Sequence, residues 1–353
     1  MEQNDIIYYN LNMICRKNND SEPDQPAQFE ESRDTVFLKY AQNYHFSITR
    51  FTLESNNIPI LIPKIQNGQN NVNLTKYAMQ MIYNDGIANI SSVATYLNYV
   101  CNNKYSNYSV SSPIINQQDS PYYYIFNIQD VVDMFNDALN RCFVNLQSLK
   151  QGIICVAPTL IYNNDNTFSI YYASIFNQSI KLYLNDDLYS LFKTFQSKYV
   201  SNNNINNQMV ISNKILNTGM INTIDYIIEK QNYPCFQNWS PVQSIVFNSS
   251  IGVSTEFVSE PQILNSNSVF GLSTNKVENI ITDIILPIDN PCDYNSFVMY
   301  NANVYREANL KVSEIRNIGL SIYWKSKFGV NYPIMLSNGN NITVKMKFEQ
   351  IKK

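Results

Sequence analysis

Glycine and histidine are scarce in this 353-residue chain, and each scarcity excludes a class of site. No two of its nine glycines are separated by one residue, which excludes the GxG-type and P-loop phosphate-binding motifs. The single histidine, His45, excludes HExxH motifs and facial triads with two histidines. The six cysteines include no CxxC pair, so zinc knuckles and redox pairs are not expected, and the scattered thiols are typical of a reduced, cytosolic protein.

Long apolar runs are also missing. No stretch approaches the roughly 18 apolar residues of a membrane-spanning helix. The acidic start, residues 1–5, is not followed by the apolar segment of a signal peptide. Apolar residues make up 44% of the chain, enough to build a core, although charged residues are only 15%. We therefore expect a soluble, folded protein without a membrane span.

Charge is distributed unevenly although the net charge is only −3. Residues 1–34 contain eight acids and three bases, a balance of −5, whereas residues 306–353 contain nine bases and three acids, a balance of +6. The plainer interpretation is two solvated ends. The alternative is a basic C-terminal face that meets an acidic partner surface or a genome.

The N-terminal part of the chain shows both strand and helix patterns. Period-two alternation predicts strands. Two prolines make residues 58–63 an extended or edge segment. Apolar residues at helical spacing predict one long helix, 127–151, which begins at Asn127 and ends before Gly152. The further predicted elements are strands at 5–15, 44–51, 74–84 and 180–184, a hairpin within 157–176, a short helix at 186–200 and a loop at 201–208.

After residue 208 the chain returns to short strands separated by turn residues. They are predicted near 209–212, 224–230, 243–247, 281–286, 297–305, 320–325 and 342–348. Many short strands with irregular spacing favour a β-sandwich or jelly roll with elaborated loops. The few helical patterns do not support βαβ repeats.

No constellation of residues indicates catalysis. His45 lies in a predicted strand without a nucleophile elbow, so we interpret it as an ordinary strand histidine. Adjacent Asp186 and Asp187 are interpreted as a helix N-terminus. A glycosidase would need two carboxylates facing each other across a cleft, for which further pairs exist in Glu256 with Glu260 and Asp283 with Asp289. We predict no catalytic, cofactor-binding or metal-binding residues.

Several blocks of the sequence, in order along the chain, carry a resemblance to a known family. The C-terminal pattern is a strand with a tryptophan, a glycine turn, a proline-containing extended piece, a second glycine turn and a final K-x-K-F strand. The matching blocks are 50–51, 58–66, 181–185 with Leu188, 239–242, 244–250, 252–253 with Glu256, 281–285, 300–306 with Leu310, and 320–348. The sequence resembles the penton, or minor capsid, proteins of virophages and of polinton-like and adintovirus-like viruses.

This resemblance implies an all-β fold, a single jelly-roll sandwich with an inserted α+β subdomain. It also implies a structural, non-enzymatic virion protein that closes the capsid vertex as a homopentamer beside the major capsid protein. The protein would be made in the host cytoplasm or a virus factory. The insertion domain is a candidate contact for a host receptor or glycan, and nucleic acid contact stays open.

The helix and hairpin in mid-chain interrupt the run of short strands. We therefore place the insertion domain at 121–205 and the discontinuous jelly roll at 1–120 and 206–353. Besides a penton, the sequence leaves open a carbohydrate- or receptor-binding β-sandwich, because its 26 tyrosines suit both sugar stacking and subunit interfaces. A hexon-type capsid protein is a further alternative, although 353 residues are short for two jelly rolls.

Overall fold

The fold is described from a computed structural model. The described residues are 5–19, 22, 24–67, 71–102, 120–153, 155–176, 179–200, 205–209, 218–221, 224–235, 238–252, 256–258, 263–265, 268–270, 276–285, 297–301 and 307–351.

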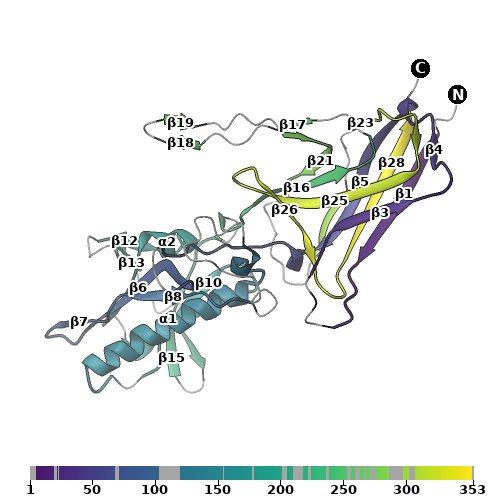
Figure 1. Ribbon diagram of the computed structural model, residues 1–353. Helices are drawn as coiled ribbons and strands as arrows, with labels where there is room; N and C mark the ends of the chain where they lie inside the picture. The colour runs from purple at the N-terminus through teal and green to yellow at the C-terminus, as the bar shows by residue number, and fades with distance from the viewer. Residues whose placement is uncertain are drawn as a thin grey trace. The chain divides into compact units, whose positions relative to one another are not determined.

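The chain divides into two compact units (Figure 1). The first contains Met1–Pro59 and Pro241–Lys353, and the second contains Ile60–Ser240. A unit made from both chain ends and a unit from mid-chain were predicted, but the boundaries differ. They differ because β6 (Leu74–Asn84) pairs with β11 (Ile180–Leu184), which brings residues on both sides of the predicted boundary at 120 into one sheet.

Two antiparallel sheets form the first unit. One has the order β1-β28-β5-β22, with β23 also on β5, and the other has the order β21-β16-β25-β26, with β3 also on β25. Their strands are β1 (Ile6–Ile14), β3 (Gln28–Ser32), β5 (Tyr44–Glu54), β16 (Val242–Ser249), β21 (Ile280–Ile284), β22 (Phe297–Asn301), β23 (Ala308–Asn309), β25 (Asn317–Ser326), β26 (Asn331–Pro333) and β28 (Asn341–Gln350).

The pairing of these strands is that of a jelly roll. In chain order the eight main strands are β1, β3, β5, β16, β21, β22, β25 and β28. The first pairs with the eighth, the second with the seventh, the third with the sixth and the fourth with the fifth. This is a long antiparallel hairpin rolled into two facing sheets. The second unit is inserted between the third strand, β5, and the fourth, β16.

The core of the jelly roll lies between the two sheets. Strict alternation in β25 sends Ile322 and Trp324 inward, each about 1% exposed, while Tyr323 points outward. The Phe51 ring on β5 meets the Phe247 ring on β16 edge-on, with centroids 5.2 Å apart, which joins the two sheets. Burial of these large side chains is the main stabilising term of the unit.

Short strand pairs and single helical turns complete the first unit. They are β2 (Gln25–Pro26) with β27 (Met335–Leu336), β4 (Leu38–Lys39) with β24 (Glu314–Ile315), β17 (Glu256–Val258) with β20 (Lys276–Glu278), β18 (Ile263–Asn265) with β19 (Ser268–Phe270), and the 3₁₀ turns η1 (Ala41–Asn43) and η2 (Ser55–Asn57).

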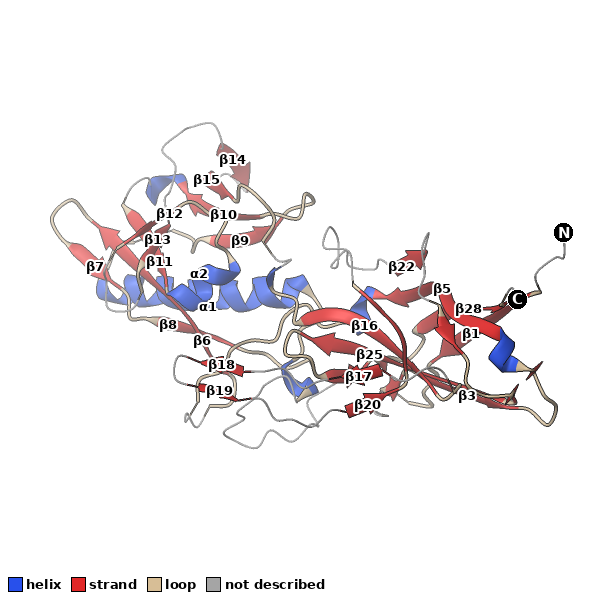
Figure 2. Cartoon of the chain, turned by 90° about the horizontal axis from the view of Figure 1, so that it is seen from above, coloured by secondary structure: helices blue, strands red, loops and turns tan. Residues whose placement is uncertain are grey.

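The second unit contains the two α-helices of the described chain, drawn in blue in Figure 2, and two further sheets. Those sheets have the orders β12-β13-β11-β6-β7, with β8 also on β6, and β14-β15-β10-β9. The elements not yet bounded are β7 (Asn89–Ser91), β8 (Thr95–Asn98), η5 (Pro121–Tyr123), α1 (Ile128–Leu149), β9 (Thr159–Tyr162), β10 (Phe168–Ala173), η6 (Ser174–Phe176), α2 (Asp186–Leu191), β12 (Ser197–Tyr199), β13 (Asn207–Met209), β14 (Thr218–Ile221) and β15 (Ile224–Lys230).

The predicted long helix is confirmed as α1. Asn127 caps its start, with Oδ1 accepting a hydrogen bond from Gln129 N at 2.8 Å, and Gly152 follows its end with a φ of +103°. Its apolar face is fully buried, and the Phe135 ring packs edge-on against Phe192 at 5.0 Å. Trp239 completes this aromatic cluster, since its indole N–H donates to the Leu191 carbonyl at 2.7 Å and its ring packs on Phe192.

Two local predictions in the second unit were wrong. The helix predicted at 186–200 ends at Leu191, because Phe192 is 1% exposed in the aromatic cluster and 197–199 forms strand β12. The loop predicted at 201–208 overlaps strand β13, which pairs with β11 and β12. Pairing with those strands overrides the polar, asparagine-rich local sequence. Residues 201–204 and most of the strand predicted at 209–212 lie outside the described residues.

Candidate functional site

The single histidine of the chain, His45, lies on a strand of the jelly roll. It is half-buried on β5, opposite Glu349 of β28 and Asn309 of β23. Its Nδ1 atom has no hydrogen-bond partner among the described residues. Among those residues, no group of three His, Cys, Asp or Glu side chains is placed to hold a metal ion.

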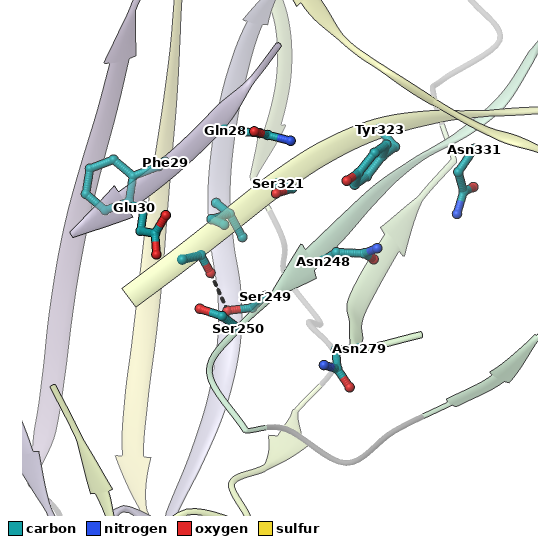
Figure 3. A pocket seen from close by; sticks show the side chains of 12 residues that line it. Gln28, Phe29, Glu30, Asn248, Ser249, Ser250, Asn279, Ser321, Tyr323 and Asn331 are labelled. Atoms are coloured by element: carbon teal, nitrogen blue, oxygen red, sulfur yellow. Dashed lines mark hydrogen bonds between the residues drawn. The ribbon is translucent and has the colours of Figure 1, made fainter. Parts of the chain in front are cut away.

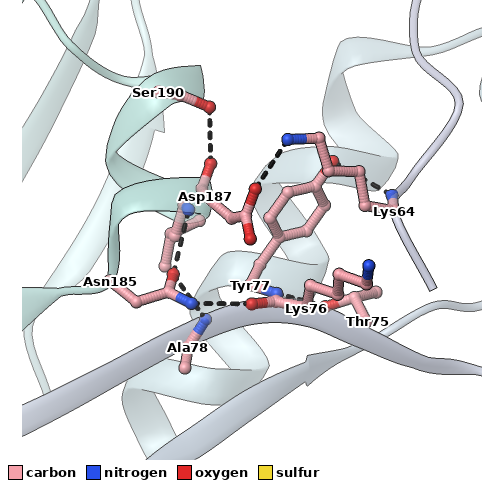
Figure 4. Close-up of polar contacts among 9 residues, drawn as sticks. Lys64, Thr75, Lys76, Tyr77, Ala78, Asn185, Asp187 and Ser190 are labelled. Atoms are coloured by element: carbon pink, nitrogen blue, oxygen red, sulfur yellow. Dashed lines mark hydrogen bonds and ion pairs between the residues drawn. The ribbon is translucent and has the colours of Figure 1, made fainter. Parts of the chain in front are cut away.

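Asp186 and Asp187 lie in the first turn of α2, as the sequence predicted, and Figure 4 shows Asp187 there. The Asp187 carboxylate pairs with Lys64 Nζ at 2.6 Å, and Asp186 Oδ1 accepts from Asn207 Nδ2 at 2.7 Å. Both carboxylates therefore have structural partners. Of the other candidate pairs, Asp283 is exposed on β21, whereas the Glu256 side chain, Glu260 and Asp289 lie outside the described part of the structure.

Asn185 connects this helix to the central strand β6. Its Oδ1 accepts from the backbone N–H groups of Leu188 and Ala78, each at 3.0 Å, and its Nδ2 donates to the Lys76 carbonyl at 2.7 Å (Figure 4). Tyr77, on the same strand, accepts from Lys64 N, and burial raises the pKa of its phenol to about 12. This polar cluster fixes a helix end to a strand, and sequence patterns alone did not reveal it.

We expect Asn185→Ala to lower the free energy of unfolding of the second unit by about 2–3 kcal/mol, since it removes a helix cap and the acceptor of a strand N–H group. Asn127→Ala is the matched control, because it removes only a cap, worth about 1 kcal/mol. Urea unfolding of both variants measures the difference. Equal losses in the free energy of unfolding would show that the contacts of Asn185 with β6 do not contribute to stability.

The outward face of the sheet β1-β28-β5-β22 combines cations with exposed apolar side chains. We call it the β1–β28 face and define it by Ile6, Tyr8, Ile14, Arg50 and Lys345. The three β1 residues are 42–54% exposed, because alternation sends Leu11 and Met13 of the same strand into the core. The Lys345 ammonium lies 4.4 Å from the centroid of the Tyr8 ring, a cation–π contact. An apolar rim beside fixed cations is a surface suited to a protein partner.

The other sheet presents different chemistry outward. Strands β3 and β25 expose Gln28, Glu30, Ser321 and Tyr323, which offer amide, carboxylate and hydroxyl groups. We call this the β3–β25 face. The jelly roll therefore has two outward faces of unlike chemistry.

Four ion pairs of the first unit each join an acid and a base of the same chain end, so they leave the charge imbalance between the two ends unchanged. Lys17 pairs with Asp24, Arg33 with Glu31, Arg316 with Glu314, and Lys347 with Glu349. The basic residues Lys345 and Lys347 lie on a central strand of a sheet, between β1 and β5, and not in a tail. No helix of the described residues has the length and apolar character needed to cross a membrane.

Comparisons with known proteins agree with this architecture. The family model of the Sputnik minor capsid protein V18/19 matches residues 7–350. The uncharacterized protein V18 of Sputnik virophage is 31% identical over 143 residues, which is 40% of this chain and 84% of that protein.

Two solved structures share the fold. A chain in the 3.5 Å cryo-EM structure of the Sputnik virophage superposes with a TM-score of 0.74 at 23% identity, covering 98% of both chains. The mavirus penton protein superposes with a TM-score of 0.64 at 19% identity, covering 98% of this chain and 100% of the other. The matching family model is that of a minor capsid protein, and the mavirus structure is that of a penton protein. With a family model that spans nearly its whole length, the chain belongs to the Sputnik minor capsid protein V18/19 family, a family of structural virion proteins.

Proposed function

We propose that the protein is the vertex capsomer, or penton, of an icosahedral virophage capsid and assembles as a homopentamer. The observation that carries the proposal is the likeness to the mavirus penton protein, which covers 98% of this chain and therefore includes both units. The β1–β28 face supports it, because its exposed apolar side chains beside cations offer one of the two different surfaces that meet at each contact of a closed ring of identical subunits.

In the proposed ring, the β1–β28 face of one subunit contacts a different surface of the next. Ile6, Tyr8 and Ile14 supply apolar area on an edge strand, and Arg50 and Lys345 supply charge that fixes the register. The neighbouring major capsid protein is the second partner in this proposal. A contact of the second unit with a host receptor or glycan, and production in the host cytoplasm, stay predictions.

The native mass of the purified full chain, measured by light scattering across a salt series, tests the proposal. We expect a native mass of about five times 40.8 kDa. The pentamer should dissociate more readily as the salt concentration rises, because part of the contact between subunits is electrostatic. A trimer or dimer at every salt concentration would contradict the five-fold role.

A matched pair of variants tests the face. Ile14→Glu places a charge on the β1–β28 face, where Ile14 is 54% exposed, and should reduce the pentamer to a monomer. Ile175→Glu makes the same change on the second unit, where Ile175 is 73% exposed, and should leave the mass unchanged. If the two changes had equal effects on the native mass, the β1–β28 face would be excluded as the contact between subunits.

A further inference from the structure

A hollow of about 760 Å³ lies on the outward side of the β3–β25 face (Figure 3). The strand register places Gln28, Ser321 and Asn248 side by side across β3, β25 and β16. Glu30 lies opposite Gly319 in the neighbouring row, and Tyr323 continues β25 beyond Ser321. The volume is within the range of about 300–1,000 Å³ typical of small-molecule sites.

Small residues keep this surface hollow. A Cβ atom added at Gly319 would lie 2.4 Å from the Ser250 hydroxyl oxygen, so only glycine fits there without a shift. The Ser249 hydroxyl donates to the Gly319 carbonyl at 2.6 Å, which ties the floor of the hollow to the end of β16 (Figure 3). The floor is therefore rigid sheet, and the site is already formed before any ligand binds.

The lining is polar and almost uncharged. The described residues that line the hollow include amides, hydroxyls, one carboxylate from Glu30 and the Tyr323 ring, with no lysine, arginine or histidine among them. Asn248 Oδ1 is buried and has no hydrogen-bond partner among the described residues. A buried acceptor without a partner is costly, so a ligand that donates to it gains affinity.

We propose that this hollow binds a neutral oligosaccharide. Sugar hydroxyls both donate and accept, which matches side-chain amides that offer both functions, and the Tyr323 ring supplies a flat surface for the apolar face of a sugar ring. The absence of cations from the described lining disfavours sulfated, phosphorylated or sialylated ligands. A peptide strand would be captured at a sheet edge, whereas the hollow lies on a sheet face. The proposal does not depend on five-fold assembly.

Binding of the labelled full chain to an array of neutral and anionic glycans tests the proposal, followed by titration with the strongest neutral ligand. We expect retention of neutral oligosaccharides, weakened about tenfold by Asn248→Ala and by Tyr323→Ala. Tyr323→Phe, which keeps the ring, should stay within about threefold of the wild type. Asn10→Ala, on the exposed side of β1 in the same unit, is the matched control and should bind normally.

Thermal melting of each variant separates lost binding from lost folding, and Tyr323 is a partly exposed side chain whose truncation spares the core. Retention of no neutral glycan, a preference for anionic glycans, or equal binding by Asn248→Ala, Tyr323→Ala and Asn10→Ala would each overturn the proposal. Light scattering on the same samples reports assembly independently, so failure of the glycan site and failure of the pentamer are distinguishable.

Discussion

Phe51→Ala is expected to lower the free energy of unfolding of the jelly-roll unit by about 3–5 kcal/mol. Phe51 is fully buried on β5, and its ring is the contact that joins β5 to Phe247 of the facing sheet. Truncation removes the buried apolar area and leaves a cavity between two sheets whose backbones cannot close it. Urea unfolding followed by tryptophan fluorescence measures the loss, because Trp324 lies in the same core.

The control for this variant is Phe328→Ala. Phe328 is 63% exposed in the turn between β25 and β26 of the same unit, so its truncation should change stability by less than about 0.5 kcal/mol. A loss for Phe51→Ala no larger than that of Phe328→Ala would show that the inter-sheet contact is not part of the core.

Lys17→Met is expected to destabilise the same unit by about 3–5 kcal/mol. The side chains of Lys17 and Asp24 are 6% and 1% exposed, with Nζ 2.5 Å from Oδ1. Removing the ammonium takes away the cation that pairs with the buried Asp24 carboxylate, which costs more than the pair itself contributed. Urea unfolding at neutral pH measures the change.

The double variant Lys17→Met with Asp24→Leu removes both charges and should recover most of the loss, because neither partner remains buried alone. Arg316→Met breaks an exposed pair with Glu314 in the same unit and should cost no more than about 1 kcal/mol. If Lys17→Met lowered the free energy of unfolding no more than Arg316→Met does, the pair of Lys17 with Asp24 would be solvated and not buried.

Strand and helix patterns with a strong period were predictable from the sequence. The predictions at 44–51, 74–84 and 320–325 fall within β5, β6 and β25, and the hairpin within 157–176 is β9 with β10. In β25 the alternation survives in the sequence because one face of the strand is buried along its whole length. The helix α1 was predictable for a similar reason, since its ten buried positions recur at helical spacing.

The division into units could not be placed correctly, although its general form was predicted. The segment 60–120 looks like continued short strands, and nothing local distinguishes β6 from a jelly-roll strand. Only its pairing with β11, about a hundred residues later, assigns it to the second unit. Contacts at such separation leave no periodic trace in a single sequence.

The surfaces on which the function is proposed also could not be predicted from the sequence. The hollow depends on a register that aligns Gln28 with Ser321 and Ser321 with Asn248, three residues drawn from both ends of the jelly roll. The sequence did predict the acidic and basic ends, but it did not show that β1 pairs with β28, so that the two ends share one sheet.

The sequence by itself indicated the family through its resemblance in ordered blocks. It also determined the fold class, the strongly periodic strands and the long helix, because hydrophobic periodicity and turn residues are local properties. The tertiary structure decided the unit boundaries, the end of α2, and which side chains face outward together. These depend on the pairing order of a hairpin rolled into two sheets, in which the first strand pairs with the eighth and the second with the seventh, across almost the whole length of the chain.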